Sequence, residues 1–186
     1  MSLVEVPPIQ GLGVYEFPTD HILVSKTDSN GVIVYANQNF LHAAGYEEAG
    51  LLDKPHSLIR HGFMPRSVFA LMWETLQKGR EFFGYVVNQR SNGDCYWVLA
   101  HVVPDFDAQT GAIIGFHSTR RWAPPRARAT AAALYARLLE AEAGGRGKKA
   151  QVEAGLVELK RILGEAGVSY EQWFFGVASA KASAEA

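Results

Sequence analysis

Short runs of β-branched and aromatic residues alternate with turn residues in two stretches of the chain, and both stretches predict β-strands. The first stretch has two runs around Asp28-Ser29-Asn30-Gly31, where the glycine supplies the positive φ of a hairpin turn. The second has three runs, with Asn92-Gly93 as a tight turn after the first and a loop over 105–111 before the third. The predicted strands are 22–26, 32–35, 82–90, 96–103 and 112–120.

Between the two strand regions the apolar spacing becomes helical. Asn37 is placed to cap a short helix that ends at Gly45, and residues 56–60 predict a single helical turn. Pro65 suits the first position of a longer helix that runs to Lys78. Apolar residues at i, i+3, i+4 and i+7 share one face of this helix: Phe69, Met72, Trp73 and Leu76.

This order of elements predicts an α+β fold. Two strands at the start and three at the end can join into one five-stranded antiparallel sheet, with the helices on one face. The space between the sheet and the helices is where a small ligand would bind. The predicted organisation is an extended lead-in over 1–19, a sensor domain over 20–122 and a C-terminal helical segment over 123–186.

The C-terminal segment has its own pattern. After Pro124-Pro125, which predict a break, the composition is typical of helices. We predict one helix over 131–143, a second along the apolar stripe of 152–163, and a third that Ser169 caps and that carries Trp173-Phe174-Phe175. Helices this short need a packing partner. They would form either a helical cap on the same chain or a homodimer, and the aromatic residues are a candidate docking point for a downstream signalling protein.

Composition and charge exclude several classes of function. The 186 residues have a formal net charge of −1 with both signs spread along the chain, which argues against nucleic acid or an anionic membrane as partner. No apolar run is long enough to span a membrane, and Cys95, the single cysteine, cannot form an internal disulfide, so a cytoplasmic protein is expected. Since catalytic motifs and Cys/His metal clusters are missing from the sequence, we expect neither an enzyme nor a metal site.

Four local strings, in this order, resemble the PAS domain family. They correspond to its first hairpin, the entry to its first helix, the turn after that helix and a later hairpin. The strings are Asp28-Ser29-Asn30-Gly31-Val32-Ile33, Tyr35-Ala36-Asn37-Gln38-Asn39-Phe40, Gly45-Tyr46-Glu47-Glu48 and Asn92-Gly93-Asp94-Cys95-Tyr96-Trp97-Val98. The resemblance implies a PAS sensor domain.

A narrower resemblance is to the PAS domain of bacterial aerotaxis receptors. It is carried by residues 54–61, by Met64-Pro65 and by Phe69-Ala70-Leu71-Met72-Trp73, while residues 134–139 are similar to the short helix that follows the domain in those receptors. The resemblance implies a PAS domain that binds FAD non-covalently, with the redox state of the flavin controlling a swimming response. Related aerotaxis PAS domains bind haem.

The chain departs from this branch at two positions. Its flavin-binding members typically read Arg-His-Pro-Asp before the Met-Pro, whereas this chain reads Arg60-His61-Gly62-Phe63. The tryptophan usual after Lys78-Gly79 corresponds to Phe82. Two alternatives to a flavin sensor therefore stay open. One is a ligand-free interaction module packed by Phe63, Phe82 and Phe83, and the other is a haem-based oxygen sensor with His56 as a candidate ligand.

Six residues make up the predicted cofactor site: Arg60, His61, Trp73, Asn37, Phe82 and Tyr85. Arg60 and His61 form the central polar pair and would contact a phosphate, ribose or carbonyl group of the ligand. Alternatively, Arg60 pairs with a carboxylate such as Asp53, and His61 caps the backbone near Pro65.

The other predicted site residues have structural alternatives. Trp73 would either stack on a flavin ring or fill the core. Asn37 would be a helix cap, a ligand donor or both, and the facing of Tyr85 depends on strand register. In the predicted mechanism, the strand 112–120 transmits a ligand-dependent shift through Trp122-Ala123-Pro124 into the helices.

Overall fold

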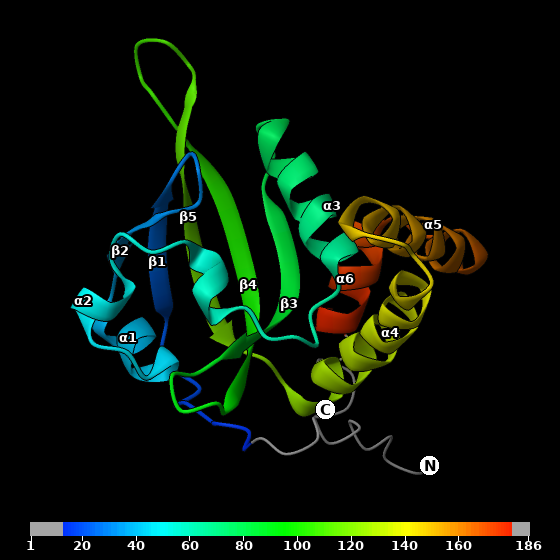
Figure 1. Ribbon diagram of the computed structural model, residues 1–186, viewed down its shortest axis with the longest axis horizontal. Coiled ribbons are helices and arrows are strands. Elements are labelled where there is room, and N and C mark those ends of the chain that lie inside the picture. Colours follow the sequence, from blue (N-terminus) through cyan, green and yellow to red (C-terminus); the bar gives the residue numbers. More distant parts are fainter. Residues whose placement is uncertain (1–12, 180–186) are drawn as a thin grey trace. The chain divides into compact units, whose positions relative to one another are not determined.

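The computed structural model describes residues 13–179 (Figure 1). The strands are β1 (Leu23–Asp28), β2 (Ile33–Ala36), β3 (Phe82–Gln89), β4 (Cys95–Phe106) and β5 (Ile113–Trp122). The helices are α1 (Gln38–Ala44), α2 (Glu48–Leu51), the 3₁₀ helix η1 (His56–Ile59), α3 (Arg66–Gln77), α4 (Pro125–Ala143), α5 (Lys148–Ala166) and α6 (Tyr170–Ser179). Most of the predicted lead-in lies outside the described residues.

The five strands form one antiparallel sheet in the order β2-β1-β5-β4-β3. The predicted α+β fold with a five-stranded sheet is therefore confirmed. Strands β1 and β5 are far apart in sequence, and their pairing joins the first two strands to the last three in one sheet. This pairing places the first hairpin beside the last strand, so residues from both ends of the domain share one surface.

Local chemistry explains the first hairpin. The Asp28 carboxylate accepts hydrogen bonds from the backbone N–H groups of Asn30 (2.9 Å) and Val32 (2.8 Å). Gly31 adopts a φ of 81°, which a residue with a side chain rarely tolerates. The predicted turn is thus confirmed, and backbone hydrogen bonds lower the pKa of Asp28 below its usual value, that to Val32 most.

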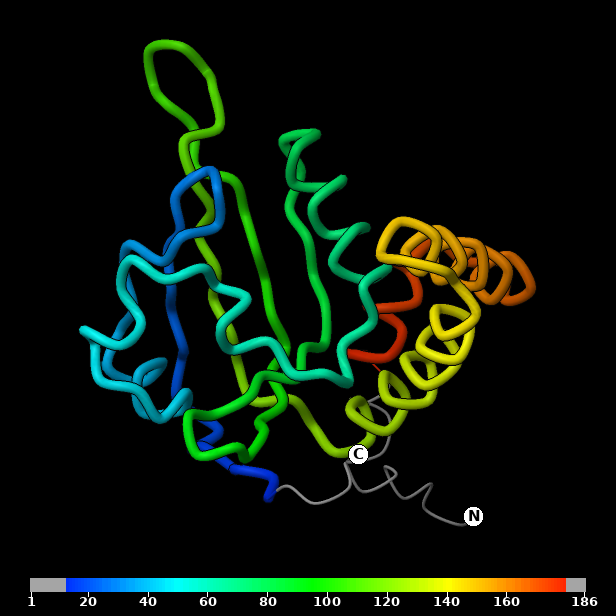
Figure 2. The backbone as a smooth tube through the Cα atoms, in the orientation of Figure 1, coloured from blue at the N-terminus to red at the C-terminus, as the bar shows by residue number. Residues whose placement is uncertain are grey.

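The β4–β5 hairpin is longer than the sequence predicts (Figure 2). We expected the strand to end at Val103, but it continues through Pro104, which pairs with Phe116 inside the strand. The connecting loop is correspondingly shorter and is stabilised by Asp107, whose carboxylate accepts from Gln109 and Thr110.

The described chain divides into two compact units. The sheet unit contains residues 13–62 and 72–123, and the helical unit contains residues 63–71 and 124–179. The sheet unit ends at residue 123, and residues 124–179 belong to the helical unit. The grouping of residues 63–71 with the C-terminal helices was not predicted, and it means that α3 contributes its first turns to one unit and its later turns to the other.

The helical unit is built on α4 and α5, which pack against each other as a hairpin, and α6 contacts α4. Helix α4 begins at Pro125, six residues before the predicted start, because a proline in the first turn has no N–H that needs a partner. The predicted cap of the third helix is confirmed: the Ser169 hydroxyl accepts from the Gln172 N–H at 3.1 Å, and the Gln172 side chain accepts from the Ser169 N–H at 2.8 Å.

Candidate functional site

One face of the sheet, called here the inner face, packs against α1. Strand alternation and register place Ser25, Arg120, Ala100 and Gly84 on this face. Its apolar part forms a continuous core with α1 and neighbouring segments. Members of that core are Leu23, Ile33, Phe40, Leu41, Tyr96, Val98 and Ala100.

A polar cluster around Arg120 interrupts this apolar face. The Arg120 side chain is buried, and its Nη1 donates to the Ser25 hydroxyl at 3.0 Å. Its Nη2 lies 2.8 Å from Nε2 of His56. Because a guanidinium can only donate, this histidine nitrogen accepts, and the ring proton resides on Nδ1. The guanidinium carbon also lies 5.0 Å from the centre of the Phe40 ring.

The cluster carries a buried positive charge with neutral partners. Burial, and next the charge of Arg120, lower the pKa of His56 to about 3, so the imidazole is neutral at physiological pH. Burial lowers the pKa of Arg120 to about 10, which still leaves the guanidinium charged at neutral pH. A buried cation is costly without a counter-charge. The side chains that Arg120 contacts within residues 13–179 supply none.

Apart from the Arg120 cluster, four buried polar atoms on the inner face have no hydrogen-bond partner among the described residues. They are Thr27 Oγ1, Asn88 Nδ2, the Tyr96 hydroxyl and Ser118 Oγ. Asn88 and Tyr96 are directly opposite each other on β3 and β4, and Ser118 is opposite Ser25 on β5 and β1. Native proteins rarely leave such groups unpaired. Each of them can donate a hydrogen bond, so the inner face is rich in unused donors.

Tyr96 is a donor rather than an anion. Burial raises the pKa of its hydroxyl far above the usual value, although the charge of Arg120 and the side chain of Asn88 oppose the rise. Asn88 lies near the hydroxyl, but the two groups do not meet with the geometry of a hydrogen bond. A ligand that offers carbonyl oxygens, ring nitrogens or negative charge would satisfy this face, whereas a cationic ligand would not.

The predicted pair Arg60 and His61 lies next to this face. Arg60 follows η1, and its backbone forms an isolated antiparallel bridge with Asn88 on β3. His61 is buried, and burial lowers the pKa of its ring. The bridge therefore brings the predicted pair beside Asn88, one of the unused donors.

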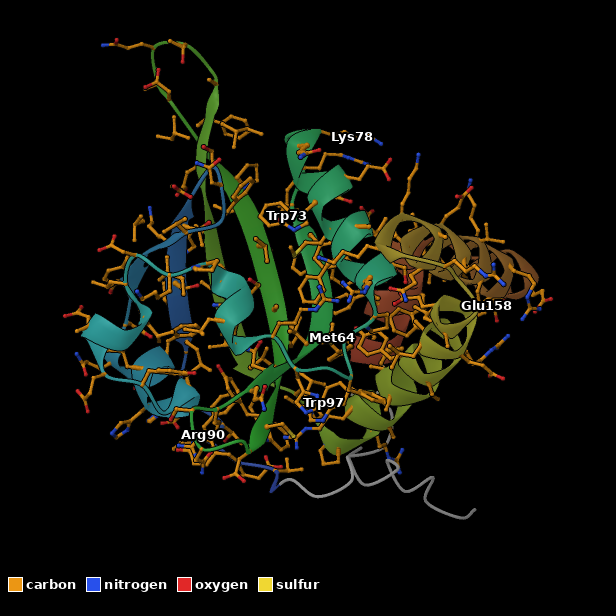
Figure 3. The ribbon with its side chains drawn as sticks, viewed as in Figure 1. Met64, Trp73, Lys78, Arg90, Trp97 and Glu158 are labelled. Carbon is orange, nitrogen blue, oxygen red and sulfur yellow. The ribbon has the colours of Figure 1, made fainter. Side chains whose placement is uncertain are left out.

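Trp73 and Phe82 also lie toward the inner face. The Trp73 ring extends from α3 toward the sheet (Figure 3) and meets Phe116 edge-on, with ring centres 5.1 Å apart. Phe116 and Phe82 are on the inner face by register, and both are buried. These aromatic rings supply the apolar surface that a planar ligand needs.

Two predicted site residues have other positions. The Asn37 side chain accepts from the N–H groups of Phe40 (2.9 Å) and Val24 (3.0 Å) and donates to the Ile22 carbonyl (2.9 Å), so it caps α1 and ties it to β1. Tyr85 is three positions before Asn88 in a continuous strand, and this odd offset places its side chain on the opposite face. Neither position supports direct ligand contact.

Sequence reasoning missed Arg120, Asn88 and Tyr96. A signal was present in the last strand, where the inner-face positions 118 and 120 hold serine and arginine instead of apolar residues. Recognising it requires the register, because Thr119 between them is also polar. Within residues 13–179 no group of three His, Cys, Asp or Glu side chains could hold a metal ion.

Comparison with known proteins agrees with the fold. Residues 33–120 match the PAS fold family. The chain is 40% identical over 146 residues to the aerotaxis receptor of Escherichia coli, covering 78% of this chain and 28% of the receptor. It is 33% identical over 88 residues to a nitrogen fixation regulatory protein of Klebsiella oxytoca, covering 47% of this chain and 18% of that protein. The chain thus spans less than a third of each of these relatives.

Solved structures give the same fold. The blue-light photoreceptor Aureochrome1 LOV domain in its light state has a TM-score of 0.54 and 20% identity, covering 59% of this chain and 87% of that one. Among residues 13–179 we find no helix with the length and apolar character of a membrane span. The matched residues extend from β2 to β5, so this part of the chain has the PAS fold, and the chain is similar to the aerotaxis receptor.

Proposed function

We propose that this chain is a signal-transduction sensor, not an enzyme, whose PAS domain binds a flavin, FAD, and reports redox or oxygen state. The observation that carries the proposal is the set of unused donors on the inner face around the buried charge of Arg120. The pyrimidine edge of a flavin ring presents carbonyl oxygens and ring nitrogens, which are the acceptors that this face lacks.

The charge of the face supports a redox ligand. A flavin supplies reversible uptake of electrons, and the negative charge that this brings is stabilised by a nearby buried cation. Arg120 is such a cation, and His56 stays neutral beside it. The protein would thus favour the reduced, more negative ligand through a charge that is already in place.

Different residues would hold different parts of the ligand. In this proposal Arg120, Asn88 and Tyr96 donate to the ring, and Trp73 and Phe82 contact its apolar part. Arg60 and His61 lie next to Asn88 and would bind the more polar ribityl or phosphate portion. The similarity of the chain to the aerotaxis receptor supports the same ligand class.

Two alternatives are less well supported. For a haem sensor with His56 as ligand, Nε2 would have to leave Arg120, to which it is hydrogen-bonded. For a ligand-free interaction module, the inner face would have to keep several buried donors unpaired. The proposal has three further parts. The protein is cytoplasmic, it forms a homodimer through the C-terminal helices, and it acts on a downstream signalling partner.

The absorption spectrum of the purified protein tests this function. Flavin bands, with FAD identified by chromatography of the heat-released cofactor, are the expected result. A Soret band would instead establish haem. If the purified protein carries no chromophore and does not bind added FAD in a fluorescence titration, the proposal is wrong.

Variants then locate the ligand. Arg60→Ala and Arg120→Gln are each expected to weaken FAD binding, and a protein that keeps full affinity in both would exclude the assigned site. Tyr85→Phe is the control, because Tyr85 is on the opposite face of the sheet. It should bind FAD with unchanged affinity.

A further inference from the structure

Helix α3 takes its N-terminal cap from a residue far away in the sequence. The residues before the helix, Met64 and Pro65, have no side-chain oxygen that could accept from its first N–H groups. The carboxylate of Glu142, in the last turn of α4, accepts from the N–H of Arg66 at 3.0 Å and from the N–H of Ser67 at 2.8 Å. It also accepts from the Ser67 hydroxyl at 2.7 Å.

Glu142 is poorly placed for its own helix. A negative charge in the last turn of α4 faces the negative end of that helix dipole, where a cation would be favourable. The side chain is also buried, with 5% of its residue surface exposed. The positive end of α3 and three hydrogen bonds offset both costs. Glu142 is therefore stabilised by α3 and not by local sequence.

Helix α5 packs over the contact between Glu142 and Ser67. Gly155 lies in the middle of this helix, where glycine is less favourable than alanine. A Cβ atom at this position would lie within 2.7 Å of Ser67 Oγ and Glu142 Oε1. The absence of a side chain at Gly155 lets α5 pack directly over the bonded pair. Three helices thus meet at one buried carboxylate, all within the helical unit.

The other end of α3 contacts the inner face of the sheet. Trp73, two turns after Ser67, packs edge-on against Phe116 of β5. A helix has little freedom to stretch, because its backbone hydrogen bonds fix the rise per residue. A rotation or shift of α3 at Trp73 would therefore also displace its first N–H groups from Glu142.

We propose that Glu142 and Ser67 form a latch through which α3 holds the α4–α5 hairpin, and that events at Trp73 and Phe116 set whether the latch is closed. This is a second route to the C-terminal helices, separate from the direct chain connection after β5. When the latch opens, the Glu142 carboxylate loses its buried partners and must reach water, so the hairpin moves with it. The latch gives the sensor two discrete states.

Hydrogen exchange followed by mass spectrometry tests the latch without reference to the ligand. In Glu142→Gln the amides of residues 66 and 67 should exchange faster by about tenfold or more, because the charge that holds them is gone. Glu140→Gln, an exposed acid on the same helix, is the matched control and should change nothing. If Glu142→Gln fails to fold, Ser67→Ala removes only the hydroxyl bond and should give a smaller increase at the same amides.

A second pair of variants tests the coupling along α3. Phe116→Ala removes the partner of Trp73 and should speed exchange at residues 66 and 67 severalfold, whereas Leu51→Ala, a buried residue of α2, should not. Equal effects of the two substitutions would show general destabilisation and overturn the coupling. Unchanged exchange in both Glu142→Gln and Ser67→Ala would overturn the latch. Both results are read from the protein without added flavin, so they stand or fall separately from the proposed function.

Discussion

Arg120 on β5 donates from Nη2 to Nε2 of His56, 2.8 Å away, and this bond requires a neutral imidazole. The acceptor nitrogen has to be unprotonated, so the imidazole is neutral while the guanidinium keeps its charge. The pair is a buried, positively charged group in which the histidine acts as a hydrogen-bond acceptor. Its formation depends on η1 lying over the strands β1 and β5.

Stability should fall at acid pH because of His56. Its pKa is lowered from 6.5 to about 3 in the folded protein, so between these values the unfolded chain binds a proton that the folded chain does not. The contribution of His56 to the free energy of unfolding is therefore fully present above pH 6.5. It decreases as the pH falls toward 3, by about 1.4 kcal/mol per pH unit at most. Burial lowers the pKa of His61 and adds to the same trend.

Urea unfolding as a function of pH measures this effect. In His56→Gln, where the amide oxygen can still accept from Arg120, the loss of stability between pH 7 and pH 5 should be smaller than in the wild type by about 1–2 kcal/mol. His42→Gln, on the other hand, replaces a histidine on the exposed side of α1 and should keep the wild-type slope. An identical slope in His56→Gln would show that His56 is not the buried neutral group.

Arg120→Gln should separate binding from stability. The substitution removes a buried charge without a carboxylate partner, so the unfolding free energy of the ligand-free protein should change little. Loss of a charged donor should weaken FAD binding by roughly ten- to a hundredfold in Kd. Fluorescence titration and urea unfolding give the two quantities.

Arg121→Gln is the matched control for that prediction. It is the next residue along β5, is exposed, and lies on the opposite face of the sheet. Its FAD affinity should equal that of the wild type. Equal losses in both variants would mean that overall charge, and not the position of Arg120, determines binding.

Ser25 and Ser118 are opposite each other across β1 and β5, but their hydroxyls differ. The Ser25 hydroxyl accepts from Arg120, while that of Ser118 has no partner within the described residues. Ser25→Ala should therefore destabilise the protein by about 1–3 kcal/mol, since it leaves a buried donor unpaired. Ser118→Ala should be neutral or stabilising in the ligand-free protein. Thermal or urea unfolding measures the stability of the two variants. If Ser118→Ala were less stable than Ser25→Ala, the assigned hydrogen bonds would be wrong.

Gly115 permits the close approach of β1 and β5. A Cβ atom there would collide with the backbone oxygen of Thr27, which cannot move without breaking the sheet. Gly115→Ala should therefore destabilise the protein by about 2 kcal/mol or more, as strained core substitutions do. Gly50→Ala, in α2, meets only an ordinary contact at 3.4 Å and should be neutral or slightly stabilising. Unfolding midpoints of the two proteins compare them directly.

The sequence by itself determined the elements and their order. Asp28 and Gly31 dictate the first hairpin, Asn37 and Gly45 bound α1, and Ser169 caps α6, because these signals act over only a few residues. The order of strands and helices was then enough for the fold class. Pro104 shows the limit of such rules, since its place inside β4 depends on pairing with Phe116.

Tertiary structure decided which residues make up the candidate site. Arg60, His61 and Trp73 were predicted and lie beside the inner face, but the facing of Tyr85 followed from a register that no local signal specifies. Arg120 meets His56, and Glu142 meets Ser67, across separations of 64 and 75 residues. Such contacts follow from the pairing of distant strands and helices. For this reason the sequence determined the sensor fold, and only the folded chain showed where its buried charges are.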